Sequence, residues 1–150
     1  MNDRDLLILF LIIIVIMLVV IVQPAYPAER ALTYGIWTQH WSGDHTEGLD
    51  NHLVAFEYDG YTGAFFRNSY GNETGFVGYG WHTKKLREEN MWLRGNVYAG
   101  ALIGYGTKHP IHFGVFSPGV YPTVSVGYKE YSLETGVMPT FWWLAFKVEF

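Results

Sequence analysis

The chain has 150 residues, a formal net charge of −4 and no cysteine. This length allows one domain, and the missing cysteine excludes a disulfide framework and a thiol nucleophile. The ten Lys and Arg residues are scattered along the chain, which argues against the clustered basic face that a nucleic-acid partner needs. We therefore expect a single domain that is stabilised by backbone hydrogen bonds and by burial.

The first 28 residues have the pattern of a signal peptide. Leu6 to Val22 is an uninterrupted apolar run, and small residues and two prolines follow it in QPAYPAE. This pattern predicts a cleaved signal peptide over residues 1–28, with cleavage after Ala28, and a mature domain over residues 29–150. The alternative is a retained membrane anchor, because the run is just long enough to cross a thin bilayer.

Beyond Ala28 the sequence alternates in polarity and shows almost no helical periodicity, which predicts an all-β fold. Eight strands are expected, at about Leu32–Ser42, His52–Tyr58, Tyr61–Ser69, Gly75–Lys84, Met91–Ile103, Phe113–Tyr128, Tyr131–Met138 and Phe141–Phe150. Turn signals separate them: Asp59-Gly60 and the stretch from Tyr128 to Tyr131 predict tight turns, and Lys84 to Asn90 predicts a longer charged turn.

The expected strands have one apolar and one polar face. In the last strand Trp142, Leu144 and Phe146 share a face, and Lys147 and Glu149 point to the other. A soluble sandwich would turn the polar face outward, whereas a membrane barrel would turn it inward. Four features favour the barrel: the export signal, the even number of strands near bilayer-spanning length, Tyr and Trp near strand ends, and an aromatic C-terminal residue. We therefore predict an eight-stranded antiparallel transmembrane β-barrel, a monomer in the outer membrane.

Strand parity places three polar residues on one rim. With both termini in the periplasm, as is usual for barrels with an even number of strands, His40 and the Asn68-Ser69 pair lie on the rim that faces the cell exterior. An imidazole and a hydroxyl with an amide beside it are parts of an acyl-transfer site, and a small barrel can hold one hydrocarbon chain. The same residues also suit an ordinary turn and a solvated strand end, so the residue types alone leave both interpretations open.

Several motifs between Phe65 and Phe150 together carry a resemblance to a known family. They are Phe66-Arg67-Asn68-Ser69 followed by Gly78-Tyr79-Gly80-Trp81, then Pro118 and Pro122 with Ser125-Val126-Gly127-Tyr128, a further proline at Pro139, and the C-terminal LAFKVEF. On these motifs the chain resembles the lipid A palmitoyltransferase (PagP) family, eight-stranded outer-membrane barrels that move a palmitoyl chain from a phospholipid to lipid A.

The resemblance implies a catalytic site on the outer rim. Thr38-x-His40 resembles the family's Thr-x-His, which implies that His40 is the catalytic imidazole, and Ser69 and Asn68 would complete the site. The implied partners are phospholipid and lipid A (lipopolysaccharide), and no cofactor or metal is expected.

The resemblance also implies a route and a pocket for the acyl chain. Tyr79 and Gly80 would belong to the acyl pocket, with Gly80 at its floor, where a larger side chain would shorten the accepted chain. Pro118, Pro122 and Pro139 cannot donate ladder hydrogen bonds, and in the family such interruptions form a lateral gate that admits lipid from the bilayer.

One departure from the family pattern keeps other functions open. Asn68 stands where the family has Asp, and an amide cannot replace the charge of an acid that orients an imidazole. Asp44 or Asp50 in the first outer loop could substitute. The alternatives are a non-catalytic structural or lipid-binding barrel that has lost the active-site acid, and a lipid A deacylase.

Overall fold

The computed structural model describes residues 30–40, 52–106, 111–138 and 141–150. The predicted signal peptide or anchor, the loop that contains Asp44 and Asp50, and the gate residue Pro139 all lie outside these ranges. No helix within the described residues is long and apolar enough to cross a membrane.

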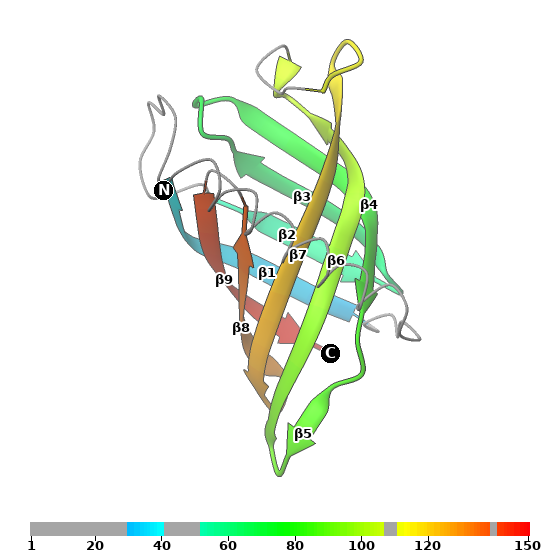
Figure 1. Cartoon of the computed structure of the whole chain (residues 1–150), viewed down its shortest axis with the longest axis vertical. Coiled ribbons are helices and arrows are strands. Elements are labelled where there is room, and N and C mark those ends of the chain that lie inside the picture. Colours follow the sequence, from blue (N-terminus) through cyan, green and yellow to red (C-terminus); the bar gives the residue numbers. More distant parts are fainter. Residues whose placement is uncertain (1–29, 41–51, 107–110, 139–140) are drawn as a thin grey trace, which may run out of the picture.

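The described chain forms one antiparallel barrel, which confirms the predicted all-β, eight-stranded fold (Figure 1). The strands are β1 (Arg30–His40), β2 (Val54–Tyr58), β3 (Tyr61–Arg67), β4 (Glu73–His82), β5 (Leu86–Glu88), β6 (Met91–Ile103), β7 (Phe116–Tyr128), β8 (Tyr131–Val137) and β9 (Phe141–Glu149). Eight of them follow one another around the barrel in the order β4-β3-β2-β1-β9-β8-β7-β6, and the pairing of β4 with β6 closes it. Closure gives each of these eight strands a neighbouring strand on both sides.

Short hairpin turns join strands at one end of the barrel. Tyr58 pairs with Tyr61 across Asp59 and Gly60, which have φ angles of 49° and 83°. Two central residues with positive φ match the twist of the flanking strands, which is why Asp-Gly favours this turn. Tyr128 pairs with Tyr131 across a second turn of the same length. Both predicted tight turns are therefore confirmed.

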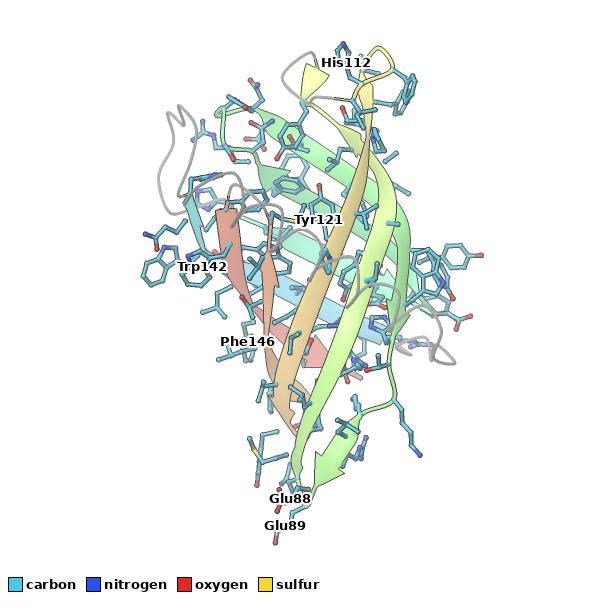
Figure 2. All side chains as sticks on the ribbon, viewed as in Figure 1. Glu88, Glu89, His112, Tyr121, Trp142 and Phe146 are labelled. Atoms are coloured by element: carbon cyan, nitrogen blue, oxygen red, sulfur yellow. The ribbon has the colours of Figure 1, made fainter. Side chains whose placement is uncertain are left out.

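The charged stretch after β4 differs from its prediction as a turn. It contains the short strand β5, which pairs with the first residues of β6 and turns at Glu89, where φ is 53°. Figure 2 shows Glu88 and Glu89 at one tip of the molecule and His112 at the opposite end. β6 and β7 are longer than the other strands. The charged residues of β5 therefore extend the sheet along the protruding end of β6.

Several predicted strand ends also shift, by one to three residues. The third strand was expected to run to Ser69, but β3 stops at Arg67 and the Asn68-Ser69 pair belongs to the turn that follows. The strand expected from Phe113 begins at Phe116, and Phe113 forms only an isolated bridge with it.

The barrel has an apolar outside, and its interior holds many polar and charged side chains beside an apolar cluster of Phe76, Tyr98 and Leu102. Large exposed side chains on the strands include Leu32, Phe56, Val77, Leu93, Val124, Leu133 and Phe146. Buried polar or charged side chains include Glu57, His82, Arg94, Asn96, Ser125, Glu134 and Lys147. On β9, Figure 2 shows Trp142 and Phe146 on the outer side, and Lys147 is fully buried. This distribution is the reverse of a soluble sandwich, whose apolar faces meet in the core.

The barrel wall is paired to different extents around its circumference. β6 and β7 pair along all 13 residues of each strand, whereas the ladder between β7 and β8 begins only at Thr123. Pro118 and Pro122 lie in the stretch of β7 that has no β8 partner among the described residues, and proline supplies no N–H for such a ladder. Next to these two prolines the wall therefore lacks ladder pairing on the side of β8 within the described residues.

Candidate functional site

A β-bulge in β1 sets the direction of His40. Ala31, Thr33 and Gly35 are buried and alternate with exposed neighbours, but the register against β9 shifts between Gly35 and Trp37. The extra residue moves the alternation by one position, so Thr38 is buried and His40 is half-buried and lines the barrel cavity. Bulges commonly redirect a side chain in this way next to functional sites. Without it, position 40 would face outward.

Asn68 shapes the turn that carries Ser69. Its Oδ1 accepts hydrogen bonds from the backbone N–H groups of Tyr70 (2.9 Å) and Asn72 (3.1 Å). Its Nδ2 donates to Thr74 Oγ1 (2.9 Å) and to the carbonyl oxygen of Gly104 (3.3 Å). An amide has two donors and one oxygen with two lone pairs, so the side chain is saturated within the turn. Asn68 therefore acts as a positioning residue for Ser69 and for the link between the β3–β4 turn and the end of β6.

Ser69 and His40 meet, although 29 positions separate them in the sequence. Ser69 Oγ lies 2.9 Å from His40 Nε2, and the imidazole also packs against the ring of Phe141, with centroids 5.2 Å apart. A hydroxyl hydrogen-bonded to an imidazole nitrogen is the arrangement from which the imidazole can take the hydroxyl proton while the oxygen attacks an electrophile. Two of the three predicted catalytic residues are thus brought into direct contact.

A cavity of about 130 Å³ extends from this pair into the barrel. Since one water needs roughly 10–15 Å³ by this measure, the cavity has room for about ten of them. The upper walls are mainly apolar and are formed by Leu53, Ala55, Ala64, Phe66, Phe76, Tyr121, Phe141 and Trp143. A narrow, mainly apolar space with a few polar groups at its ends is typical of a site for an elongated ligand.

The far end of the cavity is charged, and we call Glu57, Tyr98, Glu134 and Lys147 the floor cluster. Glu57, Tyr98 and Glu134 line the cavity. Lys147 Nζ lies 3.0 Å from Glu57 Oε2, 2.9 Å from the Tyr98 hydroxyl and 3.5 Å from Glu134 Oε2. The fully buried imidazole of His82 binds the other oxygen of Glu57. Buried charges are tolerated only when they are paired in this manner.

The mouth of the cavity carries a tyrosine pair. The ring of Tyr105, which follows β6, meets the ring of Tyr70 edge to face, with centroids 6.4 Å apart. Burial raises the pKa of the Tyr105 hydroxyl to about 12, and the neighbouring Tyr70 adds to the shift. Tyr105 therefore stays neutral at physiological pH, and it lines the same cavity as Ser69 and His40.

The two residues predicted for the acyl pocket separate. Gly80 is buried beside the floor cluster, since an added Cβ would lie 2.8 Å from Tyr98 Cε1 and 3.2 Å from Glu57 Oε1. Neither residue lines the cavity, and the ring of Tyr79 packs against Tyr61 and Trp81. Neighbouring positions of a strand face opposite sides of a sheet, so Tyr79 points outward when Gly80 points inward. An acyl pocket that includes these two residues stays a prediction.

Sequence reasoning missed the floor cluster as part of the site. The signal was present as single inward charges between apolar neighbours, such as Glu57 between Phe56 and Tyr58 and Glu134 after Leu133. Alternation predicts that such residues face the interior, but it does not say which strands bring them together. Within the described ranges no group of three or more His, Asp or Glu residues is arranged to hold a metal ion.

The comparisons with known proteins add no relative. No protein-family profile matches the chain, and a search of curated proteins finds no match either. The resemblance to the lipid A palmitoyltransferase family therefore rests on the motifs themselves.

Proposed function

We propose that this protein is an outer-membrane acyltransferase that moves a fatty acyl chain, of about palmitoyl length, from a phospholipid to lipid A. The observation that carries the proposal is the hydrogen bond of 2.9 Å between Ser69 Oγ and His40 Nε2 at the mouth of a mainly apolar cavity. A soluble hydrolase can have the same two groups. What favours a lipid substrate here is the barrel around them, with its apolar outer face.

The distribution of side chains supports the proposed insertion into a membrane. Closed barrels can cross a bilayer because every backbone polar group of the wall can be paired internally. The exposed apolar side chains would contact the acyl chains of the membrane, and the buried charges would stay inside the barrel. In the orientation usual for such barrels, with short turns in the periplasm, His40 and Ser69 lie at the outer leaflet, where lipid A is found.

The chemistry is an acyl transfer without a cofactor. The ester carbonyl of the phospholipid lies at the mouth, with its chain in the cavity. The Ser69 oxygen attacks the carbonyl carbon, and His40 Nε2 takes the hydroxyl proton. The ester bond breaks, and the departing lysophospholipid oxygen receives that proton from His40. A hydroxyl of lipid A then gives its proton to His40 and attacks the acyl-Ser69 ester; the departing Ser69 oxygen receives that proton from His40, which restores the serine. With lipid A as the acyl donor and water as the acceptor, the same site would be a lipid A deacylase.

The cavity depth suits a long chain. Phe141 pairs with His40, and Lys147, six positions later on β9, belongs to the floor cluster. Six positions correspond to about 20 Å along the strand, or roughly 15 Å along the barrel axis at a tilt of about 40°. Three backbone bonds of an extended peptide cover about 3.5 Å, so this depth corresponds to roughly 13 bonds of an extended alkyl chain.

Lateral entry is proposed at the incompletely paired stretch of β7. Pro118 and Pro122 lie there, and Tyr121, between them, lines the cavity. A lipid chain that enters through the wall keeps contact with apolar surface, whereas entry over the rim would expose it to water.

The test is lipid A mass in cells that express the protein in an outer membrane. A gain of one palmitoyl group is expected with the natural sequence. His40→Ala and Ser69→Ala should each lower the product by about 10²–10⁴-fold, the usual contribution of a proton-transferring group. The matched controls are His112→Ala, on an exposed loop, and Ser132→Ala, buried and outside the cavity lining.

An unmodified lipid A with a folded barrel would refute the transferase and favour a lipid-binding role. Free fatty acid instead of modified lipid A would identify a deacylase.

A further inference from the structure

The floor cluster differs from what a plain hydrocarbon chain needs. The terminal methyl of such a chain gains most from an apolar end wall, yet this cavity ends on two carboxylates and a phenol, each less than one-tenth exposed. Barrel stability alone would need these charges to be paired, but it would not need them to line the ligand cavity. The position of the cluster therefore bears on what the ligand carries at its far end.

Hydrogen-bond accounting shows which groups the floor can still accept. Each carboxylate offers about four acceptor positions. Glu57 uses them for His82 and Lys147, and Glu134 for Tyr98, Ser125 and Lys147. The floor cluster thus retains free acceptor capacity on both carboxylates.

The donors of the floor cluster are occupied. The three protons of an ammonium group match the three contacts of Lys147 with Glu57, Tyr98 and Glu134. The Tyr98 hydroxyl accepts from Lys147 and donates to Glu134 Oε2 at 3.2 Å. A ligand carboxylate would therefore meet two negative charges with no donor to receive it, whereas a ligand hydroxyl would find an acceptor.

From this imbalance we infer that the floor is a subsite for a neutral hydrogen-bond donor, so that the preferred ligand is an acyl chain with a hydroxyl group at or near its far end. The inference rests on the proposed function, because it takes the cavity as the acyl pocket. It narrows the substrate class to hydroxylated acyl chains. The hydroxyl donates to Glu134 or Glu57, and the Lys147 contacts stay in place.

The experiment measures binding, which separates it from catalysis. The purified full chain in detergent is titrated with palmitic acid, its ω-hydroxy derivative and the dicarboxylic acid of the same length, and Trp143, which lines the cavity, reports binding by fluorescence. If the end wall were apolar, the hydroxy acid would bind roughly tenfold more weakly than palmitic acid, because burying a hydroxyl without a hydrogen-bond partner costs free energy. We expect the hydroxy acid to bind at least as tightly as palmitic acid, and the dicarboxylic acid at least tenfold more weakly.

Variants locate the effect at the floor. Glu134→Gln removes one carboxylate and should shift the preference at least tenfold toward palmitic acid. Glu130→Gln, on the exposed turn after β7, is the matched control and should leave the preference unchanged. A tenfold preference of the natural protein for palmitic acid overturns the inference but leaves the acyl pocket intact. If none of the three probes binds, the acyl pocket fails as well, and the proposed function loses its support.

Discussion

The two halves of the barrel interior are built on opposite principles. At the mouth, mainly apolar walls surround an open cavity, and the residue pair that can do chemistry is joined by one hydrogen bond. At the floor the interior is filled, and Lys147 alone contacts three polar partners. Further down, Glu149 binds both Arg94 and Lys85. The filled half can hold the barrel together while the other half stays hollow, so stability and ligand binding are assigned to different residues.

The largest effect on stability is expected from a substitution in the floor cluster. Lys147→Met leaves the carboxylates of Glu57 and Glu134 buried without their shared cation, and removing one partner of a buried ion pair costs about 3–5 kcal/mol. We expect the urea midpoint of the folded barrel to fall sharply. Lys129→Met is the control, because Lys129 lies on an exposed turn and its ammonium group lies near the ring of Tyr128, away from the floor cluster. An unchanged midpoint for Lys147→Met would show that the floor cluster does not stabilise the barrel.

The position of His40 at the mouth can be changed without altering the floor cluster. Deleting Gln39, which follows the bulge of β1, moves His40 by one position to the place opposite Trp142, so that its side chain turns outward. The barrel should still form, because the ladder of β1 with β2 and β9 up to Gly35 is unaffected. Acyl transfer should fall by about 10²–10⁴-fold, measured as modified lipid A. Gln39→Ala keeps the residue count and should retain activity. Full activity of the deletion variant would mean that His40 is not required inside the barrel.

The bulge also marks the limit of prediction from sequence. Alternation located all eight strands of the barrel, and parity put His40 and Ser69 on one rim, because a strand's period of two is a local property. The bulge is a shift in the pairing register between β1 and β9. No residue type in the stretch TYGIWTQ requires such a shift. The floor cluster depends on closure, since Glu57 and Lys147 are 90 positions apart. From the sequence, Asn68 could be matched only to a family acid, because the hydrogen bonds that saturate its amide within the turn depend on the fold.

A larger side chain at position 80 should move the boundary between the open and the filled half of the barrel interior. In Gly80→Leu the new side chain would compete for space with the Tyr98 ring, whose Cε1 lies 2.8 Å from an added Cβ. The cavity should become shorter, so transfer of palmitoyl should fall by about tenfold, the value of one or two lost methylene contacts in a pocket, and shorter chains should be favoured. The acyl lengths on lipid A measure this. Gly63→Leu, on the outer face with nothing within 4 Å of an added Cβ, should leave the length profile unchanged. A palmitoyl profile in Gly80→Leu would place the chain elsewhere.

The smallest effect tests whether an acid at position 68 can act on His40. In Asn68→Asp one oxygen can keep the hydrogen bonds from Tyr70 and Asn72, but the other replaces Nδ2 and faces the carbonyl oxygen of Gly104. Losing this donor should destabilise the barrel by about 1–2 kcal/mol, seen as a lower urea midpoint. Asn72→Asp, exposed in the same turn, should change little. Because the turn holds the new carboxylate on its own N–H groups, we expect no gain in acyl transfer. A gain would mean that the turn can release residue 68 toward His40, and that the mouth is less fixed than the hydrogen bonds of Asn68 imply.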